Sequence, residues 1–149
     1  MRRLPATLLD LAVQSKDEPG PRVRIEQAAA ELSLSPGIWR VAWRIENLGD
    51  KSIRILAGRL PHSQFRSEER EFIPNPEISE KECARLDFSV SCREPPRAVV
   101  ENAFLILRVL YAAERWRVLA RLRVCFNEDG QPWTLIESVT AHRIGFSGV

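Results

Sequence analysis

Strict alternation of apolar and polar residues constrains this chain more than any other feature. In the stretch GIWRVAWRIEN (residues 37–47), every second position from Trp39 to Ile45 holds a large apolar residue, and arginine, alanine or glutamate fills the positions between them. Successive side chains of a β-strand point to opposite faces. The stretch is therefore predicted to form a strand with one buried face.

Similar stretches along the rest of the chain predict the fold class. The other predicted strands lie within residues 22–34, 51–58, 63–72, 84–92, 101–126 and 132–144, and the proline-containing stretch 73–79 is predicted to be a loop. Seven or eight short strands at intervals of roughly ten to fifteen residues, with no helical pattern between them, predict an all-β protein folded as an antiparallel β-sandwich.

The stretch LRVLYAAERWRVLARLRVCF (residues 107–126) carries four arginines between Arg115 and Arg123. On a helix of about 100° per residue these arginines scatter around the axis. A period of two instead places the apolar residues from Trp116 to Phe126 on one side, except Leu119 and Cys125, which lie on the other side with the arginines. We therefore expect the second strand of a hairpin. A two-residue turn would need positive φ at two alanines and would place Arg108 opposite Arg117. We expect instead a four-residue loop, residues 112–115.

The outward face of this hairpin is the predicted partner-binding site. Its apolar centre would be Phe104, Ile106, Leu110 and Leu119, and its rim would be Arg108, Arg117, Arg121 and Arg123. A solvated sheet face is normally polar throughout. We expect this face to be covered by residues 1–20, by a second copy of the chain or by another partner, because apolar surface rimmed by arginine is typical of partner sites.

Residues 1–21 are predicted to form an N-terminal segment and linker, and residues 22–149 the sandwich domain. The stretch LPATLLDLAVQ (residues 4–14) fits a short helical or extended segment. Asp10 interrupts its apolar run, so a signal peptide is not predicted. The three cysteines show no CxxC spacing and are predicted to be free thiols of a cytoplasmic protein.

The phrase WRVAWRIENLGDKSIRI, within residues 38–56, resembles the early strands of bacterial immunoglobulin-like or fibronectin-type-III-like domains. In those domains an alternating strand ends in Asn-x-Gly before the next strand begins. The resemblance implies an immunoglobulin-like sandwich and no particular function, because such sandwiches host unrelated activities. The chain departs from antibody domains, since no Cys…Trp…Cys spacing fits a disulfide across the sheets.

Two further clusters carry candidate chemistry. A possible anion site consists of Arg59, His62, Ser63 and Arg66. The favoured interpretation is that these residues pair with the nearby Glu68, Glu69 and Glu71. The glutamate-rich stretch 67–82 could bind a second copy of the chain, but a charged edge that prevents strand addition is favoured. No metal site is predicted, because no cysteine or histidine pair has close ligand spacing, and no cofactor motif is present.

The sequence thus favours a non-catalytic module for protein–protein interaction or self-association, with no membrane partner. One alternative is nucleic-acid or other polyanion binding by the arginine-rich face. The net charge of +2 argues against it, as does the placement of Trp39, Trp43 and Trp116 on apolar faces. The other alternative is a hydrolase-type enzyme that uses the His62 loop, although the chain has no GxSxG motif.

Overall fold

A computed structural model describes residues 20–145. These residues form nine strands and no helix. The strands are β1 (Val23–Leu32), β2 (Ile38–Asn47), β3 (Ile53–His62), β4 (Phe65–Glu71), β5 (Glu77–Ile78), β6 (Cys83–Ser91), β7 (Val99–Tyr111), β8 (Glu114–Phe126) and β9 (Pro132–Arg143). Eight of them correspond to predicted strands, and the short β5 lies in the predicted loop 73–79. The all-β antiparallel class is therefore confirmed.

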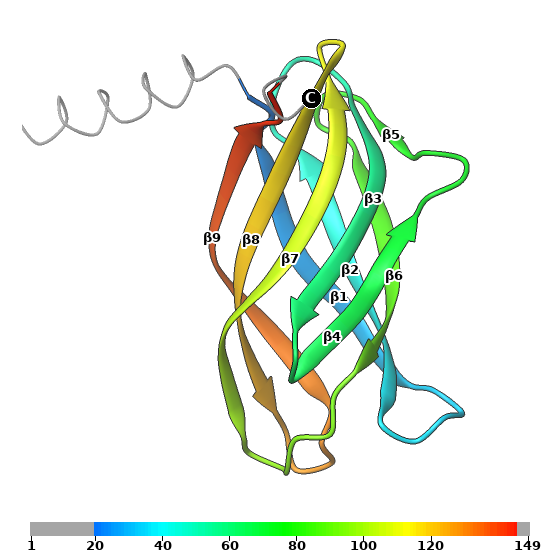
Figure 1. Cartoon of the computed structure of the whole chain (residues 1–149), viewed down its shortest axis with the longest axis vertical. Coiled ribbons are helices and arrows are strands. Elements are labelled where there is room, and N and C mark those ends of the chain that lie inside the picture. Colours follow the sequence, from blue (N-terminus) through cyan, green and yellow to red (C-terminus); the bar gives the residue numbers. More distant parts are fainter. Residues whose placement is uncertain (1–19, 146–149) are drawn as a thin grey trace, which may run out of the picture.

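The strands belong to one antiparallel sheet rather than to two clearly separate sheets. Their order is β1-β2-β6-β4-β3-β7-β8-β9, and β5 pairs with β3. The sheet curls until β1 and β9 lie beside each other, so it is barrel-like and nearly closed (Figure 1). The number and spacing of the strands predict a sandwich, in which each strand has one buried face. A curled sheet also buries one face of each strand, so alternation alone does not distinguish the two architectures.

The inward faces of the strands fill the interior with apolar side chains. Trp43 lies at the centre, fully buried, with its ring edge-on to Phe65 and Phe88 at centroid distances of 6.2 and 5.6 Å. Gly58 leaves room for this aromatic cluster, because a Cβ atom there would lie 2.7 Å from the Phe88 ring. The inward positions predicted for β2 and β6 are confirmed by this packing.

The predicted N-terminal segment lies outside the described residues, apart from Gly20 and Pro21. Within the described part of the chain, no helix is long and apolar enough to cross a membrane.

Glutamine side chains bridge the edge strands β1 and β9, and no backbone–backbone hydrogen bond joins these strands in the described part of the chain. Gln27 donates to the carbonyl oxygen of Pro132 at 3.1 Å and accepts from the backbone N–H of Thr134 at 2.8 Å and from its hydroxyl at 2.7 Å. The Thr134 hydroxyl in turn accepts from the indole N–H of Trp43 at 3.1 Å. A second glutamine, Gln131, donates to the carbonyl oxygen of Ala30 at 2.8 Å. We call these contacts the glutamine latch.

Replacing Gln27 with alanine is expected to lower the free energy of unfolding by about 2 kcal/mol, because the partly buried polar groups of Thr134 and Pro132 lose their partner. Urea unfolding followed by tryptophan fluorescence would measure the change. Gln64→Ala is the matched control, since Gln64 is exposed and no described residue hydrogen-bonds its side chain. Equal midpoints for the two variants would show that the latch does not stabilise the fold.

The register of the β7–β8 hairpin differs from the prediction. Tyr111 pairs with Glu114, so the turn has two residues, Ala112 and Ala113, with φ angles of 52° and 63°. Arg108 does lie opposite Arg117, and Glu69 on β4 offsets the repulsion by an ion pair with Arg108 at 2.8 Å. The predicted four-residue loop was wrong because a shift of two residues leaves every side chain on the same face, so the apolar pattern fits both registers.

Because both turn alanines have positive φ, replacing Ala112-Ala113 with Asn-Gly is expected to stabilise the protein by about 1–2 kcal/mol. Thermal unfolding would show a higher melting temperature. Gly130→Ala should lower the melting temperature, because it places an alanine at a positive φ of 78° where an added Cβ would have no atom within 4 Å. An unchanged melting temperature in the Asn-Gly variant would contradict the turn geometry.

Candidate interaction surfaces

The predicted apolar residues lie together on the outward face of β7 and β8. Ile106 is the direct cross-strand partner of Leu119, while Phe104 lies opposite Arg121 and Leu110 opposite Arg115. The four apolar side chains Phe104, Ile106, Leu110 and Leu119 are all half-buried. Neighbouring residues on one sheet face therefore cover part of this apolar surface and leave the rest in contact with solvent. We call this area the hairpin face.

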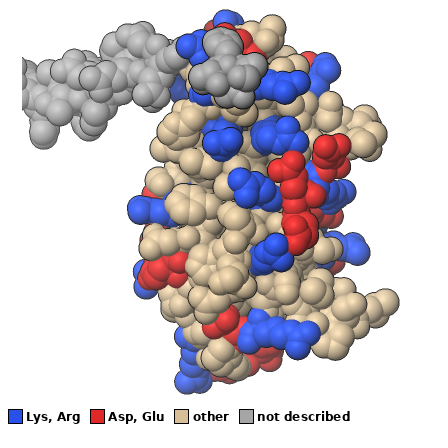
Figure 2. Space-filling model, in the orientation of Figure 1, with Lys and Arg blue, Asp and Glu red and all other residues tan. Residues whose placement is uncertain are grey.

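Most arginines of the hairpin face pair with carboxylates of the same chain. The pairs are Arg108–Glu69 at 2.8 Å, Arg121–Glu137 at 3.7 Å and Arg123–Glu101 at 3.2 Å. Arg117 differs, because it lies between Arg108 and His142 in the register and forms no ion pair with any residue that the structure describes. Figure 2 shows basic residues over much of this side of the molecule, several of them in its upper and middle part next to a group of acidic residues on the right. A free guanidinium thus borders the apolar strip.

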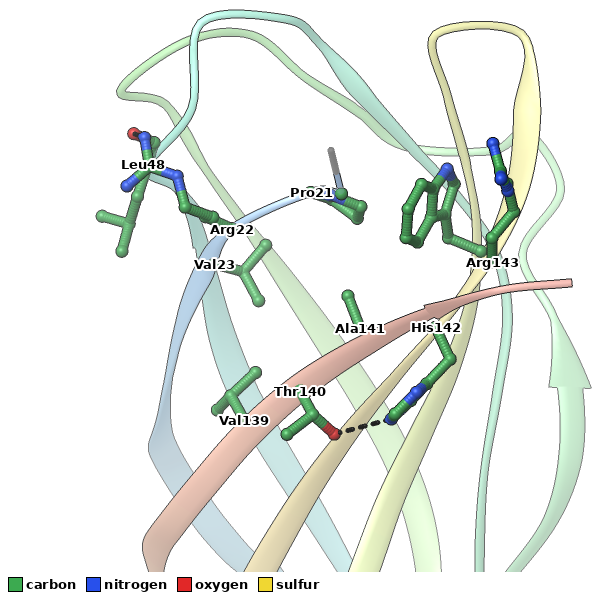
Figure 3. A pocket seen from close by; sticks show the side chains of 11 residues that line it. Pro21, Arg22, Val23, Leu48, Val139, Thr140, Ala141, His142 and Arg143 are labelled. Atoms are coloured by element: carbon green, nitrogen blue, oxygen red, sulfur yellow. Dashed lines mark hydrogen bonds between the residues drawn. The ribbon is translucent and has the colours of Figure 1, made fainter. Parts of the chain in front are cut away.

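A second candidate surface is the seam between β1 and β9, which the sequence did not reveal. In the orientation of Figure 1, the upper part of the seam opens into a cleft of about 820 Å³. A shallower hollow of about 670 Å³ adjoins the cleft, and Val23, Leu48 and Val139 line both. Figure 3 shows the side chains that line the cleft, including the hydrogen bond of 3.1 Å between His142 and Thr140. Its apolar lining includes Val23, Val139 and Ala141.

The seam combines residues more than 100 positions apart in the sequence, so no local pattern predicts it. Two weaker signals were present. Gln27 and Thr134 are polar residues at inward positions of their strands, and Trp133 and Leu135 alternate with Thr134 on the outward side, with exposures of 45% and 53%. Exposed large apolar residues beside a buried polar one would have marked this edge as unusual.

The possible anion site has its own counter-ions. Arg66 pairs with Glu68 at 2.7 Å, and Arg59 pairs more weakly with Glu69 at 3.8 Å. The Nδ1 atom of His62 accepts a hydrogen bond from the backbone N–H of Gln64 at 3.0 Å. The geometry agrees with the favoured interpretation that the arginines pair with nearby glutamates. Ser63 lies in the turn between β3 and β4.

The three cysteines are free and differ in exposure. Cys83 is exposed, Cys125 is half-buried and Cys92 is buried. No group of three or more histidine, cysteine or acidic residues in the described part of the chain could hold a metal ion. Burial raises the pKa of the Cys92 thiol to about 11, and the negative charge of Glu94 adds to the effect.

The raised pKa of Cys92 predicts a loss of stability in alkali. The folded state holds the thiol proton more tightly than the unfolded chain, whose cysteine has an ordinary pKa of 9.0. The contribution to stability is therefore fully present below about pH 9 and is lost as the pH rises toward about 11. Urea midpoints measured from pH 8 to 11 should fall less in Cys92→Ala than in the wild type, whereas Cys83→Ala should follow the wild type. Parallel curves for all three proteins would exclude this effect.

No protein-family model matches the chain, and no curated protein matches it either. Among solved structures, the chain is similar to one described as "X-ray structure of Northeast Structural Genomics Consortium target SoR45". The two chains are 12% identical, and the alignment covers 85% of this chain and 87% of the other with a TM-score of 0.28. At that TM-score the likeness supports no conclusion about fold or function.

Proposed function

We propose that this protein is a non-catalytic module that binds a protein partner through the hairpin face. The observation that carries the proposal is the half-buried pair Ile106 and Leu119 beside Arg117, which, like Arg115 opposite Leu110, forms no ion pair in the described part of the chain. Fully burying an aliphatic side chain contributes about 1.5–3 kcal/mol. A partner that completes the burial of this strip would therefore gain binding energy from residues already in place.

The charge of the face suggests the chemistry of the partner. Because Arg117 lies beside Arg108 and His142, this part of the sheet attracts a carboxylate. We therefore expect a partner segment that presents an aspartate or glutamate next to a leucine, isoleucine or phenylalanine. Apolar centres with arginine at their borders are typical of protein interfaces.

A polyanionic partner is less well supported by the same contacts. Glutamates of the chain's own strands already pair with Arg108, Arg121 and Arg123, so a phosphate backbone would have to compete with them. Sequence-independent nucleic-acid binding depends on many free basic groups. The proposed partner is thus a protein and not a nucleic acid.

The proposal includes two coarser expectations. An exposed thiol at Cys83 suits a reducing compartment, so we propose a cytoplasmic location. The alternating strand β2 and its Asn-x-Gly ending support a distant relationship to immunoglobulin-like domains. That relationship would concern ancestry rather than activity.

Selection from a random peptide library displayed on phage would test the proposed function. We expect the wild-type protein to enrich peptides that combine an acidic residue with a large apolar one. Ile106→Asp should weaken binding of an enriched peptide by at least about tenfold, the equivalent of about 1.4 kcal/mol, because it places a like charge against the peptide's acid. Fluorescence polarisation with a labelled peptide would measure the affinities.

Val99→Asp is the matched control, since Val99 is an outward apolar residue on the same strand with 47% exposure and lies away from Ile106. Arg117→Gln, at an exposed site, tests the charge without risk to the core. The proposal fails if the selected peptides bind the Ile106→Asp and Val99→Asp variants equally well. It also fails if sedimentation velocity shows that the hairpin face is buried in a stable dimer, because the occupant would then be a second copy.

A further inference from the structure

The seam between β1 and β9 has a closed half and an open half. The glutamine latch bridges the lower half, joining Gln27 and Ala30 on β1 to Gln131, which precedes β9, and to Pro132 and Thr134 on β9. Above it, no hydrogen bond joins residues 23–26 to residues 135–143 in the part of the chain that the structure describes. The facing edges of two strands therefore present unpaired backbone groups to each other.

The open half is hollow rather than packed. The cleft of about 820 Å³ lies there, and Val23, Val139 and Ala141 form part of its lining. These three side chains are only partly buried, although they pack against the core. An unpaired strand edge next to apolar side chains is a template for the addition of another strand.

The lining of the cleft is basic. It contains Arg22, His142 and Arg143 and no aspartate or glutamate. Arg143 is held in position by Glu114 at 3.3 Å and by the face of Trp116, whose ring centroid is 6.0 Å from the guanidinium carbon. Glu114 thus already neutralises Arg143, and Arg22, which forms no ion pair with any residue that the structure describes, is the charge of the lining that favours an acidic occupant.

Trp116 adds an unpartnered polar group to the same place. Its side chain is 5% exposed and lines the cleft, yet its indole N–H has no hydrogen-bond partner among the described residues. A buried indole N–H normally finds an acceptor. Because the indole nitrogen is itself buried, the Trp116 ring, and not its N–H, forms the wall of the cleft beside Gly20.

We propose that the open half of the seam is a strand-addition site for an extended peptide of a partner protein, with alternating apolar side chains and an acidic residue at the end near Arg22, His142 and Arg143. The peptide backbone hydrogen-bonds to the edges of β1 and β9, and its inward side chains fill the cleft over Val139 and Ala141. Backbone pairing supplies affinity in this mode of recognition, and the side-chain contacts supply specificity. The site shares His142 with the surroundings of Arg117 and no residue with the apolar centre of the hairpin face, so the two proposals can fail independently.

An extended peptide fits the cleft better than a small apolar molecule, because the strand edges beside the cleft carry backbone N–H and C=O groups that a peptide backbone can pair with. The seam follows β9 for residues 135–143, and each extended residue advances about 3.3 Å along a strand. A peptide of up to about nine residues therefore matches its length, and a seven-residue peptide fits within it. The apolar residues Trp133 and Leu135, exposed at the lower rim, extend the contact toward the latch.

The test uses a labelled seven-residue probe peptide, with two glutamates followed by alternating valine and threonine, and the full-length protein. We expect chemical-shift changes in the backbone amides of residues 23–26 and 135–143, and none on the hairpin face. A peptide with lysines in place of the glutamates should bind about tenfold more weakly, because the cleft repels it. A peptide with a central proline should lose binding, since proline removes a backbone donor.

Protein variants make the test specific. Arg22→Gln should weaken the acidic peptide about tenfold and leave the lysine peptide unchanged or stronger, because Arg22 is the lining arginine without an ion pair among the described residues. Arg40→Gln is the control, because Arg40 is an exposed arginine on β2, away from the cleft. Ile106→Asp should not affect this peptide, which separates the seam from the hairpin face.

Three results would overturn the proposal. The first is equal binding of the acidic, lysine and proline peptides, or no binding at millimolar concentration. The second is a set of nuclear Overhauser contacts, in the free protein, between residues 1–19 and the edges of β1 and β9, which would make the chain's own segment the occupant. The third is a dimer in sedimentation velocity whose interface maps to the same amides, which would make the occupant a second copy.

Discussion

The hydrogen bonds of Gln27 to Pro132 and Thr134 are the constraint on which the closed form of this fold depends. A curled sheet without them would end in two unpaired strands, and Trp43 would lose the hydroxyl that satisfies its indole N–H in the centre of the core. One side chain thus connects the outermost strands to the most buried aromatic residue. Because this bridge spans only the lower half of the seam, the upper half is left as a cleft.

Alternation predicted the strands and their faces well. Val41, Trp43 and Ile45 are buried on β2, and the inward positions of β6 and β8 follow the period of two in the same way. Two other properties could not be predicted from it. The hairpin register was ambiguous because pairing schemes that differ by two residues expose the same faces. The closure of the sheet was hidden because β1 and β9 meet through two glutamines distant in sequence, and nothing local links them.

The candidate surfaces show the same division. The hairpin face was predictable because both of its strands are adjacent in sequence and parity alone places Ile106 beside Leu119. Which arginines of its rim form ion pairs could not be predicted. Glu69 pairs with Arg108 from β4, and β4 is not a sheet neighbour of β7. Tertiary pairing therefore decides which arginine remains available. The seam could be recognised only from the three-dimensional structure, because its two strands are distant in sequence.

The sheet is sparsely paired at a second place, the junction between β4 and β6. β4 and β6 share only the pair Arg66 and Ser91, whereas the ladder between β2 and β6 runs from Ile38 to Glu46 without a break. The β1–β9 seam and the β4–β6 junction together divide the sheet into a block of β1, β2 and β6 and a block of the remaining strands. Because few backbone hydrogen bonds join the two blocks at these places, we expect slow opening motions to separate the blocks as units before single strands are lost.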